Sequence, residues 1–362
     1  MLSAGYTARP LDLVDINGLL DGPDVDRAYA VVCAADIGVL GTAERSREAI
    51  RANLTNPEAQ VGEHRLILTG ERESVGLLVV ERDAFKRLFV VDSYAAPRHS
   101  RDLLASLVDM GLSAARRLGV DEQWEVEAGA FAQDEAYKEV LEDAGFREVR
   151  RFWRMVIDLS AEHRVQPDPP SGVTLTVAVS DEERRLLHDV EQESFAGQFG
   201  FAPQPYDESS AWGINRRDAR PDLWWLAWSG DRPVGMCVMD DSHAHRGASH
   251  VEMLGVIPQA RGRGIASWLL RSAFATAANE GRTSLTLTVD ADNTTGATAL
   301  YEGVGMRAEQ VRVHYRHPLA SSRDGEAPSD SHEELSVITP CESGPRSVSG
   351  PTVAARSRCL GP

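Results

Sequence analysis

The sequence predicts an α/β fold of two tandem domains, each a mostly antiparallel, mixed sheet with one parallel βαβ crossover. Three observations support this prediction. The chain has 362 residues, which is more than one hydrophobic core usually serves. The two halves carry the same long-period order of apparent strands and helices. In the second half an apparent hairpin precedes a strand–helix–strand unit, so antiparallel pairing gives way to parallel pairing.

Changes in composition set the expected boundaries. The segment "VQPDPPSG" disfavours helix and strand because it is rich in proline. From about residue 320 onward Ser, Gly, Pro and acids dominate and aromatic residues are absent, so this tail buries too little surface to offset its ordering entropy. We expect a first domain over 1–160, a linker over 161–172, a second domain over 173–319 and a disordered tail over 320–362.

The elements of the second half follow from its hydrophobic periodicity. "GVTLTVAV" alternates like a strand, and Ser180 followed by acids is a typical helix start. "LWWLAW" and "VGMCVMDD" flank the turn "SGDRP" as a hairpin. "ASHVEMLGV" leads through "VIPQARGRGIA" into an alanine-rich helix, the strand "TSLTLTVDAD" and the short helix "ATALYEGVGM". This order predicts a crossover from Val251 to Val289.

The first half repeats this order. Without a gap, Val90–Leu107 aligns with Val256–Ala273, so that paired leucines fall under paired leucines. An alanine-rich helix, an alternating strand and a short helix closed by glycine then follow in both halves. The repeat favours duplicated domains over a solenoid of small units.

The stretch "VIPQARGRGIA" is a candidate anion site. Gly262 and Gly264 permit positive φ and lack the Cβ that would block a close approach, and the next helix offers free amides and a positive dipole end. Arg261 and Arg263 add positive charge, although an ordinary turn with solvated arginines is the alternative. A P-loop is excluded because GxxxxGK[ST] is absent, and a dinucleotide site is disfavoured because Ser267 replaces the third glycine.

Together, "VIPQARGRGIA" and "DADNTTGATALYEGVGM" resemble the coenzyme A loop and closing motif of the GNAT N-acetyltransferases, from about His250 to Met306. The tandem layout resembles the mycothiol-synthase-like acetyltransferases within that family. The resemblance implies acetyl-CoA as cosubstrate. It implies that the following residues contact the cosubstrate: Leu254, Gly255, Val256, Arg261, Gly262, Arg263, Gly264, Ile265, Ala266, Ser267 and Asn293.

Acetyl transfer to an amine needs a base for the amine proton, a polarised carbonyl and a proton for the leaving thiolate. His250, Glu252 and Leu254 share one strand face by the period of two, just ahead of the loop. We expect Glu252 as the base, with His250 second; the alternative is an ordinary half-polar strand. The resemblance makes Tyr301 the acid, the alternative being a tyrosine that only packs the core.

The first half lacks these parts. In the ungapped alignment it has Ala95, Ala96 and Arg98 in place of Arg261, Gly262 and Gly264. Counted back from the glycine that closes the short helix in each half, Leu141 stands in place of Tyr301. A Cβ and side chain at position 98 would enter the phosphate nest, so we expect a degenerate GNAT domain that braces the active one or lines its cleft. The alternative is that Arg98, His99 and Arg101 bind a diphosphate by charge.

The sequence therefore predicts an acetyl-CoA-dependent N-acetyltransferase that acetylates a primary amine of a small molecule by direct attack in a ternary complex. One alternative is a non-catalytic regulatory protein that binds coenzyme A, and another is an acyltransferase for longer acyl-CoA donors. The segment Glu193–Gly213 is the expected acceptor wall, because it is rich in aromatic residues, glycine and proline.

Composition excludes several other classes. The net charge of −17 argues against a nucleic-acid partner, since such binding needs a basic footprint. Four cysteines without CxxC spacing indicate neither a disulfide framework nor a zinc site, and no metal is expected. The start of the chain has no signal-peptide pattern, and the most apolar window, Ala28–Val39, is too short to span a bilayer. We expect a cytoplasmic monomer or homodimer without a membrane partner.

Overall fold

A computed structural model describes residues 5–16, 19–56, 59–69, 73–119, 123–206, 219–292 and 296–319. Asn293 and the predicted tail over 320–362 lie outside the described residues. The elements of the N-terminal half are β1 Tyr6–Pro10, β2 Val14–Ile16, β3 Leu19–Asp21, α1 Pro23–Leu40, α2 Arg47–Thr55, β4 Arg65–Thr69, β5 Glu73–Asp83, β6 Leu88–Ala95, α3 Ser100–Leu118, β7 Glu125–Phe131, α4 Glu135–Asp143 and β8 Arg147–Asp158. Those of the C-terminal half are β9 Val173–Val177, α5 Asp181–Phe195, β10 Ala219–Ser229, β11 Arg232–Asp240, β12 Ala248–Val256, α7 Ile265–Asn279, β13 Ser284–Asp290, α8 Ala297–Gly303 and β14 Arg307–Pro318.

One mixed sheet runs through both halves in the order β1-β4-β5-β6-β7-β14-β8-β13-β12-β11-β10-β9. Within it, β6 pairs with β7 and β12 pairs with β13 in parallel, while the hairpin β10–β11 and its neighbours are antiparallel. The mixed α/β fold with a repeated order of elements is thus confirmed. Ser180 also caps α5 as expected, through a reciprocal bond with Glu183.

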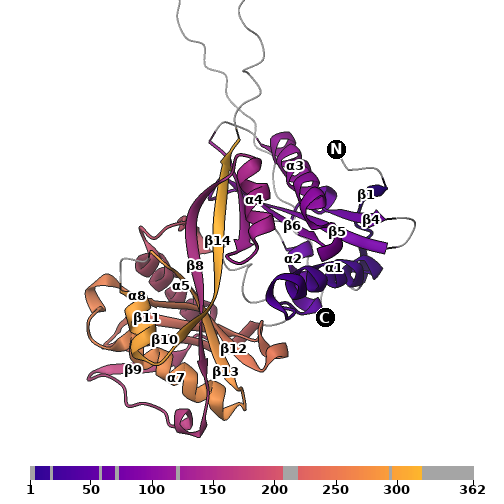
Figure 1. Ribbon diagram of the computed structural model, residues 1–362. Coiled ribbons are helices and arrows are strands. Elements are labelled where there is room, and N and C mark those ends of the chain that lie inside the picture. Colours follow the sequence, from indigo (N-terminus) through magenta and orange to yellow (C-terminus); the bar gives the residue numbers. More distant parts are fainter. Residues whose placement is uncertain are drawn as a thin grey trace, which may run out of the picture. The chain divides into compact units, whose positions relative to one another are not determined.

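The two halves exchange their last strands. The last strand of the N-terminal half, β8, lies beside β14 (Figure 1). On its other edge β8 pairs with β13, and β14 in turn pairs with β7. Each half therefore completes its sheet with a strand of the other. The division into domains at residues 161–172 stays a prediction. In that segment a short 3₁₀ turn spans Ala161–Arg164, and Trp268 and Asn279 on α7 donate side-chain hydrogen bonds to its carbonyls.

Both parallel strand pairs separate before they end. β12 pairs with β13 only as far as Val251 opposite Leu287, although the strands continue to Val256 and Asp290. β6 pairs with β7 only as far as Val90 opposite Glu127. Such a splay leaves backbone groups unpaired on facing strands, and cavities form there in both halves.

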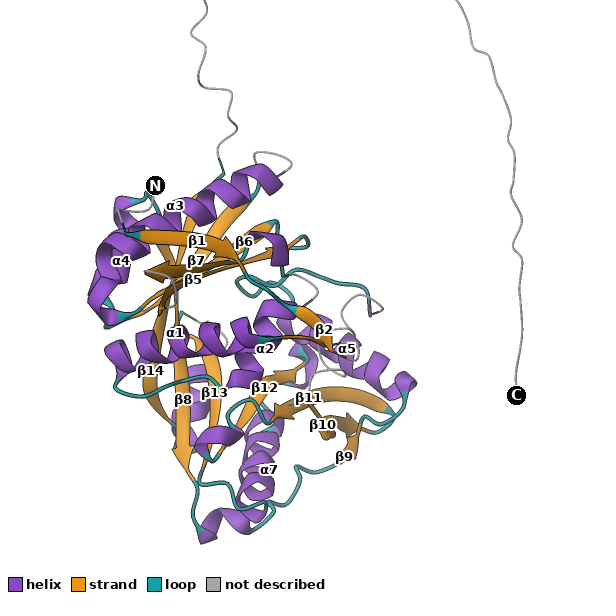
Figure 2. Ribbon diagram, turned by 90° about the vertical axis from the view of Figure 1, so that its right-hand side faces the viewer, coloured by secondary structure: helices purple, strands orange, loops and turns teal. Residues whose placement is uncertain are grey.

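Helices cover both faces of the sheet (Figure 2). In β5, Leu77 and Val79 pack in the core that contains α1, while Leu78 and Val80 pack in the core that contains α3. In the C-terminal half, α5 packs on β11 and β12, and α7 packs on β11, β12 and β13. The splayed ends of the strands therefore lie between helices that hold them in place.

Candidate active site

The glycine loop joins β12 to α7 through a 3₁₀ turn at Pro258–Ala260. Gly262 has φ 74° and Gly264 has φ 77°, so both adopt the left-handed conformation that glycine permits. The first bond of α7 runs from the Trp268 amide to the Gly264 carbonyl. By helix geometry the amides of the preceding turn remain free to bind an anion.

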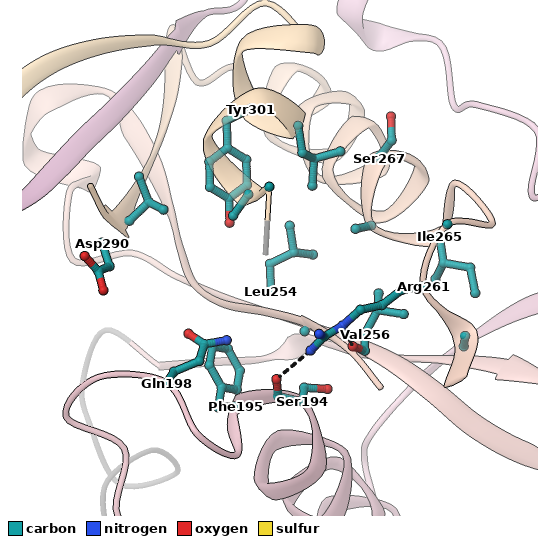
Figure 3. A pocket seen from close by; sticks show the side chains of 18 of the residues that line it. Ser194, Phe195, Gln198, Leu254, Val256, Arg261, Ile265, Ser267, Asp290 and Tyr301 are labelled. Atoms are coloured by element: carbon teal, nitrogen blue, oxygen red, sulfur yellow. Dashed lines mark hydrogen bonds between the residues drawn. The ribbon is translucent and has the colours of Figure 1, made fainter. Parts of the chain in front are cut away.

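The two arginines of the loop have different surroundings. Arg261 donates from Nε to the Val256 carbonyl and from Nη2 to the Ser194 carbonyl, each at 3.0 Å (Figure 3). This side chain ties the loop to the end of β12 and to α5. Arg263 lies on the surface and donates to the Ser229 hydroxyl at 3.2 Å and 3.3 Å. The side chain of Arg261 therefore braces the loop in addition to carrying charge.

A cavity of about 500 Å³, here called the splay cavity, occupies the gap between β12 and β13. Its lining residues comprise the two splayed strand ends, the glycine loop with the start of α7, the α8 region and the end of α5: Leu254, Gly255, Val256, Thr288, Val289, Asp290, Ala260, Arg261, Gly262, Gly264, Ile265, Ala266, Ser267, Gly296, Ala297, Leu300, Tyr301, Ser194, Phe195, Gln198, Phe199 and Phe152. The structure thus gathers the predicted cofactor residues, apart from Arg263 and Asn293, around one cavity.

Tyr301 lies on α8 at one side of the splay cavity and points toward Leu254 (Figure 3). Only 7% of the residue is exposed. Burial, together with the nearby Cys237 thiol, raises the pKa of Tyr301 to about 12. The phenol is therefore neutral near pH 7 and carries a hydrogen that it can donate into the cavity.

His250 and Glu252 adjoin the splay cavity without lining it. A bulge opposite Val238 and Met239 falls at Glu252, whose side chain is 39% exposed. His250 is buried, with Nε2 3.6 Å from Oε2 of Glu252 and Nδ1 2.9 Å from the Thr286 hydroxyl. The two side chains lie side by side at the base of the splay.

The predicted acceptor wall contributes to the splay cavity only in part. Phe195, Gln198 and Phe199 line it, and the ring of Phe199 lies against the guanidinium of Arg150. Residues 207–213 of this segment lie outside the described residues.

A third group of residues had no signal in the sequence. A cavity of about 380 Å³, here called the central cavity, lies where the two halves exchange strands. It is lined by residues from both halves: Glu44, Arg45, Phe131, Phe152, Arg154, His243, His250, Thr288, Gln310, Arg312 and His314. Of these, only His250 was a candidate from the sequence. Spacing along the chain gave no signal for the others, because they converge only after the exchange.

The splay of the N-terminal half forms a cavity of about 430 Å³, here called the N-terminal cavity. None of Arg98, His99 and Arg101 lines it. Arg98 pairs with Glu73, and Arg101 pairs with Glu139 and Asp143. His99 Nδ1 lies 2.7 Å from the Tyr6 hydroxyl. These contacts give no support to a diphosphate site made by charge alone.

Comparison with known proteins agrees with this geometry. Residues 184–306 match the acetyltransferase (GNAT) family. A mycothiol acetyltransferase of Renibacterium salmoninarum is 22% identical over 68% of this chain and 72% of its own length. One of Streptomyces griseus is 28% identical over 47% of this chain and 54% of its own. Residues 184–306 are therefore a GNAT acetyltransferase domain, and the protein is an acyltransferase.

Solved structures extend the likeness to the whole fold. A GCN5-related N-acetyltransferase from Sphaerobacter thermophilus superposes with a TM-score of 0.71 at 24% identity, over 88% of this chain and 97% of that one. A tandem GNAT protein from the clavulanic acid biosynthesis pathway gives a TM-score of 0.65 at 16% identity, over 90% and 100%. The chain thus has the fold of a tandem GNAT protein and is similar in sequence to mycothiol acetyltransferases.

The expectations that the chain has no membrane span and no metal site can be compared with the described residues alone. Across the described ranges, no helix is both long and apolar enough to cross a membrane, and the apolar window Ala28–Val39 lies within α1. No group of three or more His, Cys, Asp and Glu side chains in those same ranges is placed to hold a metal ion.

Proposed function

We propose that this enzyme transfers the acetyl group of acetyl-CoA to a primary amine of a small molecule, by direct attack in a ternary complex. One observation carries the proposal. The splay cavity has a glycine loop with free amides at one end and a buried, neutral tyrosine at its side. An anionic cofactor arm and a leaving thiolate need these two features.

The residues of the cavity fit coenzyme A. Gly262 and Gly264 leave open space where a Cβ would project, so a diphosphate can approach the amides. The unpaired edges of β12 and β13 offer backbone groups to the amides of the pantetheine arm. The Ser194 hydroxyl is buried in the same wall without a hydrogen-bond partner among the described residues. Bound acetyl-CoA would supply the activated thioester.

His250 and Glu252 are suited to remove the amine proton. The Thr286 hydroxyl lies 2.8 Å from His243 Nδ1 and 2.9 Å from His250 Nδ1. One hydroxyl has one hydrogen, so at least one ring donates its own Nδ1 hydrogen to the oxygen. When His250 is that donor, its Nε2 becomes an acceptor beside the Glu252 carboxylate. The two groups then accept hydrogens from one ammonium group, directly or through water.

Tyr301 would deliver a proton to the leaving sulfur. Its raised pKa keeps the phenol protonated throughout the range where an amine can be free base. The backbone amides of β12 near Leu254–Val256 would polarise the thioester carbonyl. The protein's part is then to align amine and thioester and to move two protons.

A thiol-release assay tests the proposal. Wild-type enzyme and acetyl-CoA are screened against amino sugars, aminoglycosides, polyamines and peptide N-termini. Tyr301→Phe should lower kcat by about 10²-fold or more. Tyr137→Phe is a matched control, because Tyr137 is a buried tyrosine that lines the N-terminal cavity. If no amine releases thiol while calorimetry detects coenzyme A binding, or if both variants behave alike, the proposal is wrong.

A further inference from the structure

The central cavity adjoins the splay cavity and is large enough for a small molecule. Phe152 and Thr288 line both cavities. The volume of about 380 Å³ lies within the usual range of ligand sites, about 300–1,000 Å³. His250, which belongs to the proton-accepting pair, also lines the central cavity. An amine held in this cavity therefore lies beside the base and on the far side of the splay from the glycine loop.

One arginine of the central cavity is neutralised by carboxylates. Arg154 forms ion pairs with Glu44 and, at 2.8 Å, with Glu309. Glu44 forms a second ion pair with Arg246 at 2.6 Å. These groups satisfy one another across the two halves. The charges of these side chains therefore cancel and leave none for a ligand to balance.

The other two arginines that line the central cavity are Arg45 and Arg312. Within the ranges that the structure describes, neither Arg45 nor Arg312 has a carboxylate within ion-pair distance. Arg45 donates to the Tyr94 hydroxyl. Arg312 donates to the Gly129 carbonyl at 3.2 Å and lies over the ring of Phe131, while its buried Nε has no partner among those residues.

Acids lie near these guanidinium groups, on the side of the N-terminal cavity. Asp36 and Asp92 line that cavity and not the central one. Asp36 accepts a hydrogen bond from the Glu44 amide at 3.1 Å. A guanidinium keeps its proton at any physiological pH. Two guanidinium groups, those of Arg45 and Arg312, thus face the central cavity, and Nε of Arg312 has a hydrogen left to donate.

We propose that the central cavity is the acceptor site, and that it selects amines which also carry a carboxylate or phosphate group held by Arg45 and Arg312. This deepens the proposed function and rests on it. The amine lies at the His250 end, and the anionic group lies at the end shared with the N-terminal cavity through Phe131 and Arg312. Strand exchange thus builds the specificity site, since Arg312 comes from β14 and Arg45 from the N-terminal half.

Matched acceptor pairs test this inference. Phenylalanine is compared with phenethylamine, and glucosamine 6-phosphate with glucosamine, in the thiol-release assay. The anionic member of at least one pair should have the higher kcat/KM by about 10- to 100-fold, as expected for charge-assisted hydrogen bonds. Arg45→Met and Arg312→Met should abolish this preference by raising KM for the anionic acceptor alone. Arg98→Met, an exposed arginine outside these cavities, is the control.

Every outcome of this comparison either supports or overturns the proposed preference for anionic acceptors. The activity of each variant on the neutral acceptor shows whether it has folded, and Arg45→Lys and Arg312→Lys, which keep the charge, should retain part of the preference. Equal kcat/KM within both pairs, or variants that slow both members alike, overturns the inference.

If no amine is acetylated, the proposed transfer fails, and calorimetry with N-acetylphenylalanine and inorganic phosphate tests the arginine site alone. Binding by the wild type that both methionine variants lose supports an anion site in the central cavity. Equal binding or none overturns it.

Discussion

Alanine at Gly264 should weaken acetyl-CoA binding without costing more stability than alanine at Gly281. The two glycines flank α7, have φ of +77° and +82°, and would each place a Cβ in open space. The left-handed conformation alone therefore sets the cost in folding free energy, about 1–2 kcal/mol at either position. That cost should lower Tm by a few degrees in both variants. Of the two glycines, only Gly264 lines the splay cavity, where the phosphates are proposed to bind.

The effect on binding follows from the amides of the loop. Loss of one hydrogen bond to a charged phosphate is worth about 1.5–3 kcal/mol, which corresponds to a rise of about 10- to 100-fold in KM for acetyl-CoA. Steady-state kinetics with varied acetyl-CoA, and calorimetry with coenzyme A, measure this rise against Gly281→Ala. If the two variants have the same KM and equal losses in Tm, the loop does not hold the phosphates and the reasoning fails.

Three further predictions concern protons and charge. Glu252→Gln should lower kcat/KM by about 10²-fold or more, and an unchanged kcat/KM would exclude Glu252 as the base. Because burial holds the pKa of Tyr301 at about 12, kcat should not fall up to about pH 10, the ordinary pKa of tyrosine; a decline there that is absent from Tyr301→Phe would contradict this. Burial raises the pKa of Glu44, but Arg154 and Arg246 outweigh it and the net pKa is lowered. Ionised Glu44 therefore stabilises the folded state fully above the pKa of glutamate in the unfolded chain, about 4.3. This stabilisation is lost as the pH falls from there through the lowered pKa of the folded state. Arg154→Met should cost about 3 kcal/mol at neutral pH, and thermal melts should show the difference from wild type shrinking in acid.

Local features of the site were predictable from the sequence. Positive φ at Gly262 and Gly264 follows from the tight turn between a strand and a helix, and the cap at Ser180 follows from the acids after it. Both features depend on neighbours within one turn. The place of Tyr301 beside the cavity was expected only from the resemblance to the GNAT family.

Features that depend on distant pairing were not predictable. The alternating pattern of β14 indicates a strand, but it does not say which open strand edge β14 pairs with. In the structure β14 pairs with the edge of β7, in the other half. Arg45 and Arg312 meet in one cavity only because of that choice. The side chain of Arg261 was expected to supply charge to an anion. Its hydrogen bonds to two carbonyls depend on where α5 lies, and spacing along the chain does not give that position.

The exchange of strands also bears on how the chain is made. When the N-terminal half leaves the ribosome, β7 has one open edge, and β8 has no neighbour, because both of its partners are encoded downstream. An open edge of this kind is prone to pair with other chains until β14 arrives. Contacts between residues so far apart in sequence also slow folding. A chain that ends before Arg307 would thus leave the edge of β7 open and would leave β8 paired with β13 alone.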